Sequence, residues 1–270
     1  MNSAFTAWKK TFDIIKKYPQ ILTPFIAVGI IEFLALYILF LAPQRPVSIL
    51  LAPPIKAFFG ERFLHYPYNM SLLPKLMYYA HILISASIGI LMTGTALGMI
   101  KDAHEKKAPK FLRSFAAALR RCLTLLGAWI VMFGLLFLVK KGTALVTPET
   151  GATLTLSCLS YIAAVLSQVI FIYTMPAIMY EKKGLFAALK RGLQFFVRFP
   201  VPSLMVVFLP ALLYIPVIIS NFKIPMMLKA PFPEIIVYLL SAGILTTVVI
   251  DILITASSAL LFLKEGKVKP

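Results

Sequence analysis

The sequence predicts an all-α integral membrane protein that forms one transmembrane domain over residues 1–270. Composition is the first observation behind this prediction, because the 270 residues are 60% hydrophobic and 14% charged, with a mean hydropathy of +0.89. A soluble domain carries about 25% charged residues, and a globular core of this size still needs a polar surface. The second observation is the presence of six apolar stretches that approach or exceed the roughly 20 residues needed to cross a bilayer.

The six expected spans are residues 21–42, 77–100, 123–139, 154–180, 201–221 and 235–263. The third is close to the lower length limit, whereas the fourth and sixth are long, which favours tilt or protruding ends. The second span carries small residues four apart, among them Gly94 and Gly98, a spacing that lets helices approach closely within the chain or between protomers. Pro176, Pro210 and Pro216 predict kinks in the fourth and fifth spans.

The third observation is the distribution of charge, 27 Lys and Arg against 10 Asp and Glu. Four basic residues precede the first span, seven separate the second from the third, five separate the fourth from the fifth, and three follow the sixth. The opposite connections hold three, two and two, and Lys75 at the outer edge of the second span completes the 27. Because Lys and Arg accumulate in cytoplasmic segments, we expect both termini in the cytoplasm.

Three segments that precede the odd-numbered spans predict amphipathic helices lying in the cytoplasmic membrane interface. Residues 2–18, 111–126 and 185–196 each place large apolar side chains at helical spacing, with basic side chains away from them. They share the order Ala, large apolar, two basic, any, large apolar, any, two apolar. The basic pairs are expected to contact anionic phospholipids or protein partners; they are Lys9 and Lys10, Arg120 and Arg121, and Lys190 and Arg191.

This shared order predicts three repeat units, residues 1–110, 111–183 and 184–270, each a surface helix followed by two spans. In the first and third units an aromatic–proline pair, ending at Pro19 or Pro200, would end the surface helix and turn the chain. Chance similarity among Leu- and Lys-rich segments is the alternative. The first unit contains an outward insertion, residues 43–74, rich in Pro and aromatic residues. We expect it to lie on the outer interface, with docking on a partner as the alternative.

Three ionisable residues fall inside the expected spans: Glu32 in the first, His81 in the second and Asp251 in the sixth. An ionised carboxylate at the bilayer centre is unfavourable by about 2.5–3.5 kcal/mol on insertion scales. The two acids therefore either face each other as a proton or cation site, or are protonated or hydrogen-bonded groups that lock helix packing. His81 either pairs with Glu32 or forms a packing hydrogen bond.

The sequence predicts no catalytic residue, metal site or cofactor. Two cysteines, Cys122 and Cys158, are too few for a disulfide scaffold or a four-ligand metal site. Phosphate-binding glycine loops, a nucleophile elbow and HExxH are absent from the sequence. The basic residues are dispersed between apolar segments instead of forming a soluble module with aromatic residues, so nucleic acid is not an expected partner.

The motifs ALRRCL (118–123) and ALKRGL (188–193), each leading into a hairpin of spans, resemble a group of little-characterised six-span prokaryotic membrane proteins. That group includes the YciC-like proteins and the membrane domain attached to some glycerophosphodiester phosphodiesterases. The resemblance covers nearly the whole chain through architecture and a degenerate motif. It implies a prokaryotic cytoplasmic (inner) membrane protein with a membrane-embedded role. No phosphodiesterase catalytic domain is present, so that activity is not implied.

Two functions follow as expectations. The first is a non-enzymatic membrane scaffold or accessory subunit that engages anionic lipid, other membrane subunits or further copies of itself. The triple basic motif and the lack of a reaction motif favour it. The alternative is a transporter or permease with an intramembrane acidic site at Glu32 and Asp251. The two expectations differ in whether these acids meet inside the bundle.

Overall fold

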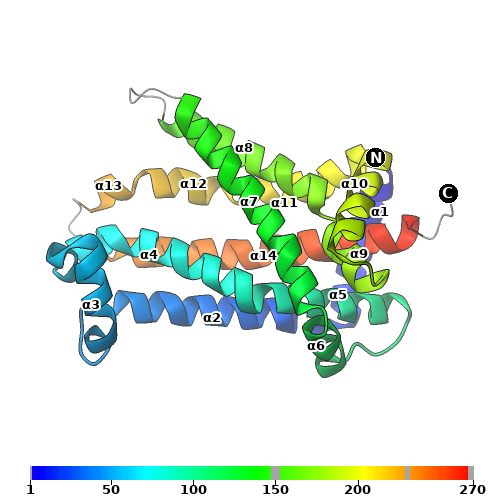
Figure 1. Cartoon of the computed structure of the whole chain (residues 1–270), viewed down its shortest axis with the longest axis horizontal. Helices are drawn as coiled ribbons and strands as arrows, with labels where there is room; N and C mark the ends of the chain where they lie inside the picture. Colours follow the sequence, from blue (N-terminus) through cyan, green and yellow to red (C-terminus); the bar gives the residue numbers. More distant parts are fainter. Residues whose placement is uncertain (1, 147–152, 229–231, 267–270) are drawn as a thin grey trace.

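The computed structural model describes residues 2–146, 153–228 and 232–266, and this part of the chain is helical without any strand. The helices run beside one another in an elongated bundle (Figure 1). Both ends of the chain lie at one end of it, on the right in Figure 1, which we call the terminal end. This end holds α1 (Asn2–Lys17), α6 (Phe111–Leu119), α9 (Thr174–Tyr180) and α10 (Leu185–Arg198). The opposite, distal end holds α3 (Ser48–Phe59) and α13 (Ile224–Met227).

Four continuous helical stretches are long and apolar enough to cross a membrane, and they correspond to the first, second, fourth and sixth expected spans. The first joins the 3-10 turn η1 (Pro19–Leu22) to α2 (Thr23–Phe40). The second joins α4 (Tyr68–Ile84), the π-helical turn η3 (Ser85–Gly89) and α5 (Ile90–His104). The stretch that corresponds to the fourth expected span is the end of α8 (Thr153–Phe171) with α9. The stretch that corresponds to the sixth is α14 (Ile235–Glu265). A multi-pass membrane protein is therefore the class that the fold supports.

The remaining two expected spans belong to sharply bent helix pairs. α6 meets α7 (Cys122–Val146) at 72°, and α10 meets α11 (Pro200–Leu212) at 98°. The second bend lies between the segment predicted as a surface helix and the segment predicted as a span. The first bend falls inside the predicted surface helix 111–126, which ends at Leu119 because residues from Cys122 onward already belong to α7. The fifth expected span is itself divided, because α11 ends at Leu212 and α12 (Ile215–Phe222) begins anew with Pro216 in its first turn. Proline has no backbone donor, which favours a helix start over an uninterrupted helix there.

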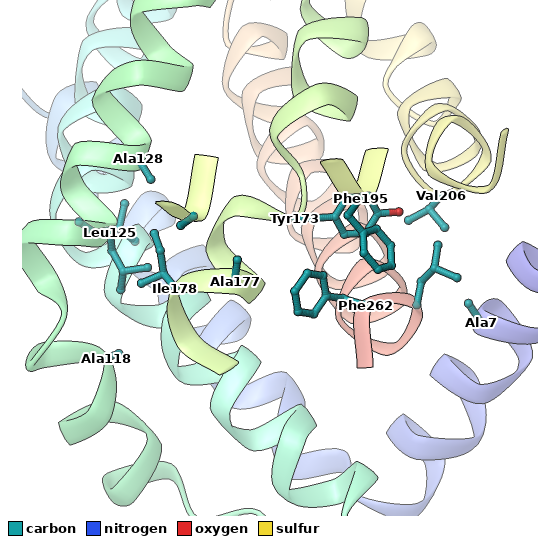
Figure 2. Close-up of a cluster of buried hydrophobic side chains, with 13 residues drawn as sticks. Ala7, Ala118, Leu125, Ala128, Tyr173, Ala177, Ile178, Phe195, Val206 and Phe262 are labelled. Atoms are coloured by element: carbon teal, nitrogen blue, oxygen red, sulfur yellow. The ribbon is translucent and has the colours of Figure 1, made fainter. Parts of the chain in front are cut away.

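The surface-helix motif presents its small residues to the core. Its three shared alanines, Ala7, Ala118 and Ala188, are buried and belong to one hydrophobic cluster, part of which Figure 2 shows. Within that cluster the rings of Tyr173 and Phe195 lie 4.5 Å apart, centroid to centroid. Other large apolar side chains of these three segments are exposed, whereas Leu125 and Phe195 are buried in the cluster. The exposed ones include Phe5, Phe12, Leu119, Leu123 and Leu193.

The small-residue face predicted for the second span is a packing face within the chain. A Cβ atom at Gly98 would lie 2.9 Å from the Cβ of Ser114, and one at Gly94 would lie 3.0 Å from the Cβ of Ala118. Both neighbours belong to α6. The two glycines thus allow α6 to lie directly against α5, which confirms the predicted close approach.

The outward insertion is folded onto the ends of α2 and α4. It contains α3 and the 3-10 turn η2 (Glu61–Leu64), and Ile55 of α3 is buried against Ala42 and Leu72. Its end differs from the expected one, because α4 already begins at Tyr68 and Pro74 lies inside that helix. The insertion is expected to end at Pro74, but buried apolar residues from Met70 onward already pack as part of α4.

Candidate intramembrane site

Helices α2 and α4 bring Glu32 and His81 into direct contact. The Nδ1 atom of His81 lies 2.6 Å from the Oε1 atom of Glu32. The Glu32 side chain is only 3% exposed, whereas that of His81 is 43% exposed. Of the two alternatives for His81, the structure shows the contact with Glu32.

The position of Glu32 follows from the close approach of α2 to α14. Gly29, about one helical turn before Glu32, faces α14, where an added Cβ would lie 2.9 Å from Cγ2 of Val248. Glu32 is consequently enclosed by protein. A buried carboxylate needs a hydrogen-bonding or charged partner, and His81 supplies it. The contact can hold one proton between the two groups or form an ion pair with the imidazolium.

The pair lines a cavity of about 360 Å³, which we call the Glu32 cavity. Residues from α4, α12, α13 and the first half of α14 complete its walls, so the cavity lies toward the distal end. Tyr78, Tyr214, Asn221 and Thr247 contribute polar atoms, and most other lining residues are apolar. Pockets that bind small molecules have similar volumes and a similar excess of apolar wall.

Asp251 lines a different and smaller cavity, of about 110 Å³, which we call the Asp251 cavity. This cavity lies between α5, α7, α8, α9, α11 and α14, and Gln168 is among its polar lining residues. The two acids therefore do not share one cavity, so the acidic site expected from Glu32 and Asp251 together is not formed. A transport centre would have to rest on Glu32 and His81 instead.

A polar stripe on α14 runs from the lining of the Glu32 cavity to the lining of the Asp251 cavity, and it was not predicted from the sequence. Thr247 lines the Glu32 cavity, and Asp251, Thr255 and Ser258 line the Asp251 cavity. Their spacing of four, four and three residues places them on one helix face. The sequence contains this spacing, which could have predicted the polar stripe. Thr247 and Ser258 donate hydrogen bonds to carbonyls of their own helix, which lowers the free-energy cost of burying them.

The predicted basic pairs divide into two groups. Arg121 donates from Nη1 to the carbonyl of Ile178 at 3.2 Å, and Arg191 donates from Nε to Oε1 of Glu181 at 3.0 Å. Both acceptors lie at the C-terminal end of α9, where helix carbonyls favour positive charge. These two arginines thus fasten α9 to α6–α7 and α10. The other four members point away from the core and remain candidates for lipid contact: Lys9, Lys10, Arg120 and Lys190.

The carboxylate of Glu181 is held by two cations just outside the membrane-spanning stretch. Lys183 approaches Oε2 at 2.9 Å and Arg191 approaches Oε1 at 3.0 Å. Partial burial acts to raise the pKa of Glu181, but the hydrogen bonds and charges of Lys183 and Arg191 outweigh it and lower the pKa below its ordinary value. Glu181 is thus a charged anchor of the terminal end.

Within residues 2–146, 153–228 and 232–266, no group of three or more His, Cys, Asp or Glu residues is placed to hold a metal ion. Cys122 is a partly buried free thiol. The side chain of Cys158 lies outside the part that the structure describes. The candidate site accordingly consists of the ionisable residues in the bundle and the exposed basic residues at its terminal end.

No protein-family model, curated protein or solved structure matches this chain. The resemblance to the YciC-like group therefore stays an expectation, and function has to be inferred from the geometry of the site.

Proposed function

We propose that the chain is a non-enzymatic membrane transport protein whose ionisable centre is the Glu32–His81 pair. The observation that carries this proposal is a carboxylate, 3% exposed and 2.6 Å from an imidazole, in the wall of a cavity of about 360 Å³. Ionisable residues inside membrane bundles are unfavourable, and they typically mark ion, proton or substrate pathways. A role in packing alone would not require a cavity beside the pair.

The unequal exposure of the two side chains suggests how the centre works. His81 is 43% exposed and lines the cavity, so it is the member of the pair through which a proton would enter or leave, whereas Glu32 is enclosed. Loss of the His81 proton leaves the charge of Glu32 without compensation, which favours entry of another cation or a rearrangement of α4 against α2. Protonation is thereby coupled to the occupancy of the cavity.

The finer topology is also part of the proposal: six spans as three hairpin units, with both termini in the cytoplasm and the chain in a prokaryotic inner membrane. The bends of 72° and 98° support separate surface helices before the third and fifth spans. The equivalent burial of Ala7, Ala118 and Ala188 supports a repeated unit. The basic segments that flank the spans favour a cytoplasmic terminal end.

A second candidate, a scaffold or accessory role through anionic lipid, is favoured by the outward face of α1. Phe5 and Phe12 are 64% and 55% exposed, and Lys9 and Lys10 are exposed as well. Each lysine near an anionic surface contributes about 1 kcal/mol. Charge reversal at Lys9, Lys10, Arg120 and Lys190 should then reduce the phosphatidylglycerol retained by the purified protein in native mass spectrometry. Unchanged retention would remove this candidate.

The transport proposal is tested by reconstitution into liposomes that contain a trapped pH-sensitive dye. With an imposed pH gradient and membrane potential, we expect flux that depends on pH for at least one solute in a panel of inorganic and organic cations. Glu32→Gln removes the charge and keeps the shape, so we expect at least a tenfold loss. Glu61→Gln, the same change at an exposed acid of the insertion, should have no effect. A wild-type protein without pH-dependent flux, or a Glu32→Gln variant with full flux, contradicts the proposal.

A further inference from the structure

The walls of the Glu32 cavity combine one carboxylate with extensive apolar surface. Met77, Val217, Leu240 and Ile244 form much of that surface. A small inorganic cation needs several oxygen ligands to replace its hydration shell, and no group of three or more His, Cys, Asp or Glu residues among the described residues is placed to hold one. The cavity therefore suits a ligand with one positive charge and an apolar body.

Two tyrosines add a second feature that favours a cation. Tyr78 and Tyr214 both line the cavity, and Tyr214 is close enough to Glu32 to interact with it electrostatically. The faces of aromatic rings attract organic cations, and quaternary ammonium ligands are commonly held this way. A carboxylate beside aromatic rings is accordingly a site for an ammonium group.

The charge balance of the cavity permits one cation at a time. Among the described residues that line it, none is Lys or Arg, so His81, when protonated, is the lining cation that can balance Glu32. The other titratable groups near the pair are Tyr78 on α4, Tyr214 before α12, and Asp251 on α14, which lines the Asp251 cavity. A ligand cation at Glu32 would stand beside the imidazolium proton, and that proton would leave to water.

We infer that the Glu32 cavity binds a lipophilic organic cation, an amine or quaternary ammonium ion, in exchange for the proton on His81. This inference rests on the proposed transport function and names its substrate class. The cation and the proton compete for the single charge of Glu32. Movement of one in each direction would make the exchange an antiport.

The test is equilibrium binding of benzyltrimethylammonium to the full chain in nanodiscs, with empty nanodiscs subtracted. Neopentylbenzene has the same shape without the charge and should fail to compete. Affinity should fall as the pH is lowered from 8.5 to 5.5, by up to about tenfold per pH unit, because one proton competes with one cation. Calorimetry in buffers of different ionisation enthalpy should detect release of about one proton per cation bound when the pH keeps His81 protonated.

Variants separate the roles of the two residues. Glu32→Gln should weaken binding by at least tenfold, and Tyr214→Leu should weaken it several-fold without removing the ionisable pair. His81→Asn should still bind but lose proton release and most of the pH dependence. Glu61→Gln serves as the matched control and should match the wild type.

Three results would overturn the inference: equal binding of the neutral isostere, full binding by Glu32→Gln, or proton release that survives in His81→Asn. Failure of this inference can be distinguished from failure of the transport proposal. Cation binding with proton release but without flux contradicts transport alone. Flux of other solutes without benzyltrimethylammonium binding contradicts the substrate class alone.

Discussion

The two ends of the bundle are packed in different ways. At the terminal end the core contains many alanines and a few large rings, and glycines of α5 lie directly against α6. At the distal end the core consists of larger side chains such as Leu36, Met77 and Ile244, and these leave the Glu32 cavity between the helices. Small residues permit close helix approach, whereas large ones keep helix axes apart and leave irregular gaps. We infer that the terminal end is the fixed part of the molecule and the distal end the part that responds to a ligand or proton.

The largest effect on stability is expected from breaking the Glu32–His81 contact. His81→Leu leaves a buried carboxylate without its partner, which we expect to lower the free energy of unfolding by about 2–3 kcal/mol. Chemical unfolding in mixed micelles measures it. Replacing both partners with leucine should recover much of the loss, because apolar pairs of similar volume are tolerated where one unpaired charge is not.

If His81→Leu unfolds like the wild type, the carboxylate of Glu32 does not depend on the imidazole. The Glu32–His81 contact would then not stabilise the distal end, and this difference from the terminal end would disappear. A double variant less stable than His81→Leu would indicate that volume, not charge, is what the contact supplies.

The membrane class and most spans could be predicted because an apolar run of about 20 residues leaves few alternative structures. The contact between Glu32 and His81 was also within reach, since both residues lie at comparable depth in neighbouring spans. The two cavities were not, because a cavity depends on how each helix is rotated about its axis. Glu32 and Asp251 occur at similar expected depth, yet α14 presents Asp251 to another set of helices.

The bonded arginines illustrate a second limit of the sequence. Arg121 and Arg191 occupy the same motif position as Lys10, which is exposed. The difference arises from α9, whose C-terminal end reaches both arginines, whereas Lys10 is exposed in the part of the chain that the structure describes. An amphipathic pattern indicates which side of a helix is polar, but not which polar residues meet a later part of the chain.

An intermediate effect is expected from the same substitution at the two ends of the bundle. Gly98→Ala would place a Cβ atom 2.9 Å from Cβ of Ser114, which cannot move without the α6 backbone, so we expect a loss of about 1–3 kcal/mol. Gly243→Ala meets only Cγ1 of Val217 at 3.5 Å, an ordinary contact. Alanine there should stabilise α14 by up to about 1 kcal/mol. Thermal unfolding in nanodiscs compares the two variants, and shifts of equal sign would mean that packing at the two ends does not differ.

The smallest effect is expected from the charges around Glu181 at the terminal end. Its pKa is lowered by Lys183 and Arg191, so the ionised form is favoured by folding. Stabilisation from such a group is fully present above the ordinary pKa of about 4.3 and is lost as the pH falls through the lowered pKa. Glu181→Gln should therefore reduce the free energy of unfolding by about 0.5 kcal/mol at pH 7, with a similar deficit at pH 5.5 that shrinks as the pH falls through the lowered pKa.

Salt provides the complementary measurement, because partly exposed ion pairs are screened at high ionic strength. The Glu181→Gln deficit should shrink in 1 M NaCl, whereas the Gly98→Ala deficit should stay unchanged, since it arises from steric overlap. If charge mainly stabilised the terminal end, Glu181→Gln would lower the free energy of unfolding more than Gly98→Ala does. High salt would then remove most of the Glu181→Gln loss. Close packing of α5, α6 and the shared alanines would then no longer account for the difference between the two ends.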